Sequence, residues 1–221
     1  MAPYIIWDWN GTLLDDVDAA VYALNQMLAA RGLPRRVERG FYRAHFGFPV
    51  RPFYALLGMD PDAEWDRICE DFHRHIADGP QRVRAESAPA LSLARSLGIG
   101  QSILSALRQD LLLRDTAAAG LQPFFDEIYG VDNLDGASKL DRGVALVARL
   151  RERGLLPASR RLFFVGDTMH DSEVASALGA EAVLVDGGHQ TAERLAHSRR
   201  SVVPSLSDAV RLIAATADPS A

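Results

Sequence analysis

Residues 4–13 read Tyr-Ile-Ile-Trp-Asp-Trp-Asn-Gly-Thr-Leu. The first four are apolar, which predicts a short strand buried on both faces, and Asn-Gly predicts a turn soon after it. Asp8 therefore stands where the strand ends. Ligands of open α/β sheets bind at the carboxyl ends of the strands, so Asp8 is a candidate nucleophile. This stretch alone is also compatible with an ordinary strand-ending turn.

Strand and helix patterns alternate in the second part of the chain. Strands are predicted at 100–104, 127–130, 161–165, 182–185 and 201–203. Helices are predicted at 88–97, after Ser105 as far as residue 119, and at 140–153, 172–178 and 207–214. Such alternation is typical of a parallel sheet with helices on both faces. The sequence thus predicts an α/β fold, a Rossmann-like doubly wound parallel sheet.

Only helical patterns occur between the first strand and Gly79. Apolar residues recur at helical spacing in 17–31, 39–45, 50–57 and 63–77. We therefore expect a helical domain, here called the helical insert, at residues 16–82. The sheet domain would comprise residues 1–15 and 83–221.

The composition excludes several classes of protein. The chain has 221 residues, 48% of them hydrophobic, a formal net charge of −5 and no long basic run, which argues against a nucleic-acid surface. No apolar run is long enough to span a membrane. Cys69 is the only cysteine, so an internal disulfide is impossible and a cytoplasmic location fits. Nothing indicates an obligate protein partner.

Lys139 is the only lysine among 24 basic residues. A position that keeps lysine against so strong an arginine bias is a candidate for a site that needs a compact, single-point ammonium. The other interpretation is that one lysine survived by chance in an exposed loop.

Polar side chains at four strand ends are predicted to meet at one edge of the sheet. They are Asp8 to Thr12, Ser105, Lys139, and the Gly166-Asp167-Thr168-Met169-His170-Asp171 segment. Together they describe a phosphoryl-transfer site, in which Asp8 attacks, Thr12 and Ser105 donate hydrogen bonds to phosphoryl oxygens, and Lys139 holds both carboxylate and phosphate. Taken alone, Ser105 or Asp171 would be read as a helix cap.

The same edge predicts a magnesium site. Mg²⁺ prefers oxygen ligands and keeps several waters, so the Asp8 carboxylate, the Asn10 backbone carbonyl and Asp167 suffice. Asp171 would orient a metal-bound water or hold in place the residues that bind the metal.

These motifs resemble those of haloacid dehalogenase superfamily hydrolases, in the branch of the phosphoglycolate phosphatases. Asp8-Trp9-Asn10-Gly11-Thr12 resembles the first motif, Ser102-Ile103-Leu104-Ser105 the second, Lys139 the third, and Val165 to Asp171 the fourth. The resemblance implies a phosphatase that forms an aspartyl-phosphate and uses Mg²⁺.

The resemblance extends to substrate binding. The helical insert is similar to the family's cap, and Arg43 to Arg51 to its specificity loop. This implies that Arg43, His45 and Arg51 bind a substrate anion, although arginines on surface helices explain two of them equally well. Gly11 and Ala106 are further implied substrate contacts, with Ala106 standing where asparagine is common in this branch.

Asn10 departs from the family pattern, in which an aspartate at this position carries the catalytic proton. An amide cannot replace a general acid–base, which is worth about 10²- to 10⁴-fold in rate. Three explanations remain open. His45 or His170 moves the proton, the protein binds phosphate but turns over little, or Asn10-Gly11 deamidates to aspartate.

The sequence favours a Mg²⁺-dependent phosphatase acting on a small phosphorylated metabolite. The alternative is a phosphate- and metal-binding regulatory protein with little turnover. A metal-independent 2-haloacid dehalogenase would tolerate Asn10, but the Asp167 and Asp171 pair disfavours it.

Overall fold

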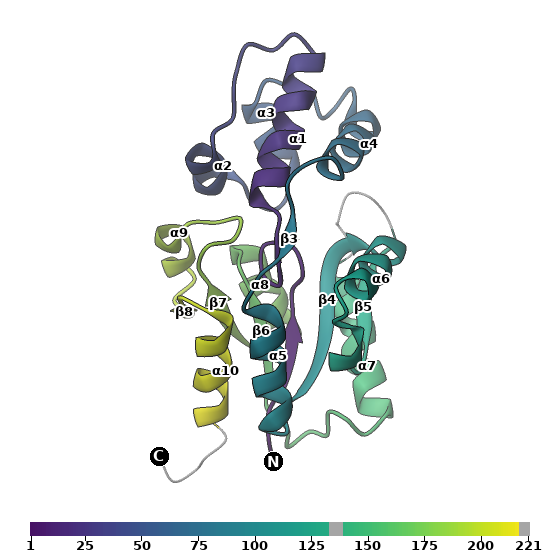
Figure 1. Ribbon diagram of the computed structural model, residues 1–221, viewed down its shortest axis with the longest axis vertical. Helices are drawn as coiled ribbons and strands as arrows, with labels where there is room; N and C mark the ends of the chain where they lie inside the picture. Colours follow the sequence, from purple (N-terminus) through teal and green to yellow (C-terminus); the bar gives the residue numbers. More distant parts are fainter. Residues whose placement is uncertain (133–138, 217–221) are drawn as a thin grey trace.

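Six strands form one parallel sheet in the structure, a computed structural model that describes residues 1–132 and 139–216 (Figure 1). Strand β1 (Tyr4–Trp7) lies at the centre, between β4 (Gly100–Arg108) and β6 (Leu162–Gly166). Outside them lie β5 (Ile128–Val131), β7 (Glu181–Val185) and β8 (Ser201–Val203), in the order β5-β4-β1-β6-β7-β8. The predicted α/β, Rossmann-like fold is confirmed.

Helices cover both faces of the sheet, which explains the unbroken apolar run of β1. Alternate residues of a strand point to opposite faces. Ile5 and Trp7 pack in the cluster with α5 (Ser87–Ser96), α6 (Gln109–Ala118) and α10 (Leu206–Ala215). Tyr4 and Ile6 pack in the cluster with α7 (Lys139–Glu152) and α8 (Met169–Ala177).

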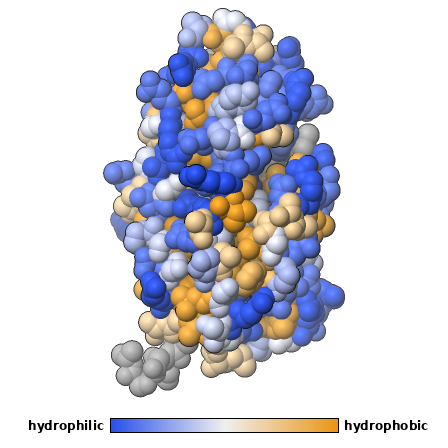
Figure 2. Space-filling view, in the orientation of Figure 1, coloured by the Kyte–Doolittle hydropathy of each residue, from blue (hydrophilic) through white to orange (hydrophobic). Residues whose placement is uncertain are grey.

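Four helices stand beyond the carboxyl end of β1 (Figure 1). They are α1 (Val17–Ala30), α2 (Arg39–His45), α3 (Arg51–Leu56) and α4 (Trp65–Ile76), and they enclose an apolar cluster separate from the two at the sheet. The chain enters them after β2 (Leu14–Asp15) and returns through β3 (Arg82–Val83), and these two strands pair antiparallel. On the face drawn in Figure 2, hydrophilic residues cover most of these helices.

Several elements differ from the sequence-based expectation. Strands β2 and β3 have two residues each and are too short for a periodic pattern. Helix α8 begins at Met169 rather than at residue 172, because Thr168 and Asp171 form a capping box at its start. Helix α9 (Ala192–Ala196) and a 3₁₀ turn (Gln122–Phe124) were not predicted. Within residues 1–132 and 139–216, no helix is both long and apolar enough to cross a membrane.

Two neighbouring leucines of α6 test the packing of the sheet. Leu112 is fully buried in the cluster beneath α5, α6 and α10, whereas Leu113 is 40% exposed. We expect Leu112→Ala to lower the free energy of unfolding by about 2–5 kcal/mol, since it removes buried methyl groups and leaves a cavity. Leu113→Ala should change it by less than about 0.5 kcal/mol. Urea denaturation followed by circular dichroism measures both, and equal losses would contradict this packing.

Candidate active site

A buried ion group occupies the edge of the sheet where β1 ends. Lys139, the first residue of α7, places its Nζ 2.6 Å from Asp8 Oδ1 and 2.7 Å from Asp171 Oδ1. All three side chains are nearly inaccessible to solvent. Burial alone would lower the pKa of Lys139, but Asp171 and Asp8 outweigh it and raise the pKa. Lys139 is therefore an ammonium at neutral pH.

Asp171 is fixed by the start of α8. Its Oδ2 accepts hydrogen bonds from the backbone N–H groups of Asp167 and Thr168 and from the Thr168 hydroxyl, while Oδ1 accepts from Lys139. Burial opposes ionisation, but Lys139 and these donors keep the pKa of Asp171 below its usual value. Both oxygens of this carboxylate are therefore engaged, Oδ1 by the Lys139 ammonium and Oδ2 by the start of α8.

Asp167 lies beside the loop that carries the first motif. Its Oδ1 accepts from the Thr12 hydroxyl at 2.8 Å, and its Oδ2 accepts from the backbone N–H of His189 at 2.6 Å. Gly11 and Gly188 pack so closely on Asp167 that a Cβ at either position would collide with it, and Gly11 has a φ of +74°. Larger residues are therefore excluded from both positions.

Three carboxylates could share a metal ion. Asp8, Asp167 and Asp171 each offer one oxygen, and these oxygens lie within 4.8 Å of one another. Burial raises the pKa of Asp8 to about 8, and the charges of Asp171 and Asp167 add to this effect against the opposing influence of Lys139. The ionised form of Asp8 is thus disfavoured by burial and by its carboxylate neighbours, and a divalent cation with a preference for oxygen would favour it.

Asn10 is held from two sides. Its Nδ2 donates to Asp16 Oδ2 at 2.8 Å, and its Oδ1 accepts from the Ser105 hydroxyl at 3.3 Å. The Gly11 N–H also donates to Asp16, at 2.8 Å. Deamidation requires this nitrogen to attack the Asn10 side chain, so the bond to Asp16 opposes it. The deamidation hypothesis remains a prediction, testable by mass spectrometry of the first peptide.

The sequence analysis missed a second ion pair, Asp16 and His189. Their Oδ1 and Nε2 atoms lie 3.2 Å apart in a buried setting, and the Tyr42 hydroxyl lies 2.9 Å from His189 Nδ1. Burial alone would lower the pKa of His189, but Asp16 outweighs it and raises the pKa to about 9. The pKa of Asp16 is correspondingly lowered. His189 follows the predicted strand at 182–185, so the strand-end argument applied there would have found it.

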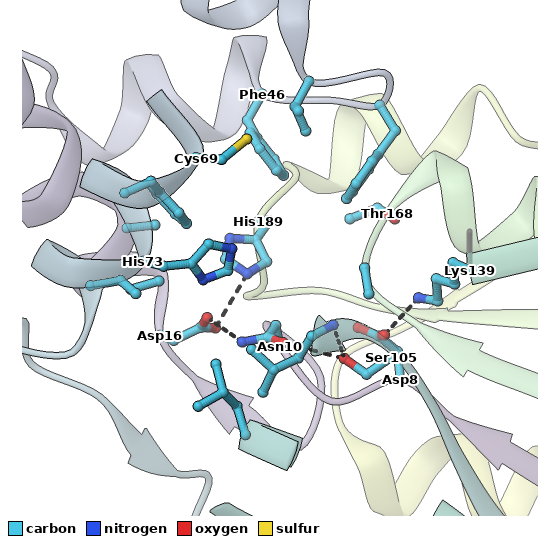
Figure 3. Close-up of a pocket in the computed structure, with 18 of the residues that line it drawn as sticks. Asp8, Asn10, Asp16, Phe46, Cys69, His73, Ser105, Lys139, Thr168 and His189 are labelled. Carbon is cyan, nitrogen blue, oxygen red and sulfur yellow. Dashed lines mark hydrogen bonds and ion pairs between the residues drawn. The ribbon is translucent and has the colours of Figure 1, made fainter. Parts of the chain in front are cut away.

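A cavity of about 270 Å³ joins this edge of the sheet to the helical insert (Figure 3). In the close-up, Asp8, Asn10, Ser105 and Asp16 lie at one end, and Phe46 and Cys69 lie at the other. The predicted site residues that line it are Asp8, Asn10, Ser105, Ala106, Lys139 and Asp171. Gly11, Thr12 and Asp167 lie behind this wall and support it.

The cationic residues predicted to bind substrate do not line the cavity. Arg43 instead binds Asp186 and the carbonyl oxygens of Gly188 and Gln190, and so ties α2 to the sheet domain. His45 is exposed and bonds to the Phe41 carbonyl. Arg51 is half-exposed, with its guanidinium over the Trp65 ring.

His170, the other predicted proton carrier, also lies outside the cavity lining. Its ring stacks on Phe48, with the centroids 4.6 Å apart.

Residues 5–185 match the model of the haloacid dehalogenase-like hydrolase family. The chain belongs to this family. The resemblance carried by Asp8 to Thr12, Ser105, Lys139 and Asp167 is thereby confirmed at the level of the family, and the roles of the individual residues remain proposals.

Relatives of this haloacid dehalogenase-like chain carry different names. Tyrosine-protein kinase PtkA of Mycobacterium tuberculosis is 27% identical over 208 residues, which cover 90% of this chain and 67% of that protein. A phosphoglycolate phosphatase of Mesorhizobium japonicum is 29% identical over 194 residues, 85% of this chain and 84% of that protein. The structure of the mycobacterial PtkA superposes with a TM-score of 0.78 at 21% identity, covering 96% of this chain and 98% of that one, and shows a shared fold.

The ion pair of His189 predicts a dependence of stability on pH. A histidine whose pKa is raised from 6.5 to about 9 stabilises the fold fully below pH 6.5 and loses this contribution as the pH rises through 9. The contribution is about 3 kcal/mol. We expect His189→Gln to remove it, so that parent and variant converge at high pH in urea denaturation. His197→Gln, at an exposed position, is the control, and a constant difference between parent and His189→Gln across this range would contradict the ion pair.

Proposed function

We propose that this chain is a Mg²⁺-dependent phosphatase that hydrolyses a small phosphorylated substrate through an aspartyl-phosphate on Asp8. One observation carries the proposal. Asp8 Oδ1 is held by Lys139, whereas no hydrogen bond from the described residues reaches Oδ2, and Asp8 lines the cavity. A buried carboxylate oriented by an ammonium and open on one side to a cavity is suited to nucleophilic attack.

In the first step, Asp8 Oδ2 forms a bond to the phosphorus atom and the bond between phosphorus and the leaving oxygen breaks. The electron pair departs on that oxygen, which takes a proton from water. The Lys139 ammonium offsets the negative charge that gathers around the phosphoryl group. The Ser105 hydroxyl, which lines the cavity and donates to Asn10 Oδ1 in the structure, would turn to donate to a phosphoryl oxygen. In the second step, water attacks phosphorus, inorganic phosphate forms and the Asp8 carboxylate is regenerated.

The Asp8 and Asp167 carboxylates and the Asn10 backbone carbonyl would hold the magnesium ion, with Asp171 in support. A bound Mg²⁺ shields the phosphate from Asp8 and neutralises charge that develops on its oxygens. Carboxylate oxygens have enough lone pairs to bind a cation while Asp167 keeps its contacts with Thr12 and His189.

We also propose the domain boundaries given above, with residues 16–82 as the cap and residues 1–15 and 83–221 as the sheet domain. The pairing of β2 with β3 at these boundaries supports the division, as does the separate apolar cluster of the helices. Residues 133–138 and 217–221 of the sheet domain lie outside the described part of the chain.

Hydrolysis of p-nitrophenyl phosphate tests the chemistry. We expect turnover with Mg²⁺ and none with EDTA. Asp8→Asn, which keeps the shape of the side chain but removes the nucleophile, should lower kcat by at least about a thousandfold. Turnover that survives either change would overturn the proposal, and halide release from a 2-haloacid in EDTA would favour a dehalogenase.

A second candidate function is phosphate and metal binding with little turnover, which Asn10 favours because an amide cannot activate water. The number of nitrophenolate molecules released per chain separates the two. We expect many turnovers. A burst of at most one nitrophenolate per chain, with a phosphorylated Asp8 detected by mass spectrometry, would favour the binding protein.

A further inference from the structure

The helical insert contributes mainly apolar side chains to the cavity. Six side chains of the helical insert line it while keeping part of their surface exposed: Phe46, Phe48, Val50, Trp65, Phe72 and Ile76. All except Phe48 also pack against the apolar cluster of the helices. Phe48 lies outside that cluster, contacts the Phe46 and His170 rings, and lines the cavity.

The same wall offers little to an anionic substrate group. Across residues 16–82, all of which the structure describes, no arginine or lysine lines the cavity, and His73 is the one basic side chain there. Arg114 of α6 reaches the cavity, but its guanidinium lies 2.8 Å from Asp115 and its side chain is 67% exposed. A carboxylate is best held by an arginine fork, which this wall lacks.

The cavity is large enough for a single aromatic ring and a phosphoryl group. A dry apolar cavity of about 150 Å³ binds benzene. The volume of about 270 Å³ therefore leaves room for the phosphoryl group beside Asp8 and Lys139. A ring between the aromatic side chains of the insert would also gain edge and stacking contacts.

Asn10 points independently to the same kind of substrate. With an amide at this position, the leaving oxygen receives no proton from residue 10. Phenols have a pKa of about 10, whereas aliphatic alcohols ionise only near the pKa of water, about 15.7. His189 also lines the cavity, but its Nε2 is paired with Asp16 and its Nδ1 lies against the Tyr42 hydroxyl. With residue 10 and His189 both unable to protonate the leaving oxygen, a phenolate departs far more readily than an alkoxide.

We propose that the substrate is an aryl phosphate, the phosphate monoester of a single-ring phenol, with the ring among the aromatic side chains of the helical insert. This inference rests on the phosphatase function proposed above. Asp8 Oδ2 forms a bond to phosphorus, the bond between phosphorus and the aryl oxygen breaks, and the electron pair leaves on the phenolate, which takes a proton from water. A second water then releases phosphate from Asp8.

Four substrates test the inference on the full chain with Mg²⁺: p-nitrophenyl phosphate, phenyl phosphate, benzyl phosphate and 2-phosphoglycolate. Benzyl phosphate keeps the ring but has an aliphatic leaving oxygen. We expect kcat/KM for phenyl phosphate to exceed that for 2-phosphoglycolate by at least about a hundredfold, since the proton that residue 10 lacks is worth about 10²- to 10⁴-fold. Benzyl phosphate should lie between them, because it retains only the contacts of the ring.

Two matched variants separate recognition of the ring from leaving-group reactivity. Phe48 lines the cavity, whereas Phe41, also a half-buried phenylalanine of the insert, does not. Phe48→Ala should lower kcat/KM for phenyl and benzyl phosphate by about tenfold and leave 2-phosphoglycolate unchanged. Phe41→Ala should change none of the three. Thermal melts confirm that both variants fold.

The outcomes distinguish this inference from the proposed function. If p-nitrophenyl phosphate is hydrolysed but kcat/KM for 2-phosphoglycolate equals or exceeds that for phenyl phosphate, the aryl substrate is overturned. The phosphatase function would still hold in that case. Equal losses on all three substrates in Phe48→Ala would also overturn it. Absence of hydrolysis of every ester, with p-nitrophenyl phosphate included, would overturn both.

Discussion

The buried ammonium of Lys139 joins three segments that are far apart in the sequence. It lies between the carboxylates of Asp8, after β1, and Asp171, at the start of α8. Removing one member of a buried ion group costs about 3–5 kcal/mol, because a charge is left without a partner. The position of α7, the orientation of Asp8 and the first turn of α8 therefore depend on one another.

The cavity has two ends with different chemistry, and they come from different parts of the chain. The sheet domain supplies the ion group and Ser105, whereas the helical insert supplies aromatic walls. Two contacts hold these parts against each other: the bonds of Arg43 to the loop after β7, and the bond between Tyr42 and His189. Because the two ends are built separately, membership of the family does not identify the substrate.

The sequence predicted the strands of the sheet, most of its helices and the gathering of Asp8, Ser105, Lys139 and Asp171, since each signal was local. Apolar runs mark parallel strands, and polar residues after them share an edge. The partners of Arg43 could not be predicted, because whether a surface arginine faces a ligand or a neighbouring loop depends on long-range packing. The strand-end argument could have placed His189 at this edge, but its pairing with Asp16 depends on long-range packing in the same way. Their pairing is visible only once the loops after β1 and β7 lie side by side.

The short ribbon of β2 and β3 brings the two ends of the helical insert together. Leu14 lies opposite Val83 and Asp15 opposite Arg82, so the chain leaves the sheet domain and returns to it at neighbouring positions. An insertion with adjacent ends places no strain on the register of the strands around it, and changes in its length are tolerated. One contiguous piece of chain can therefore be exchanged between these two strands while the edge of the sheet that holds Asp8 and Lys139 keeps its geometry.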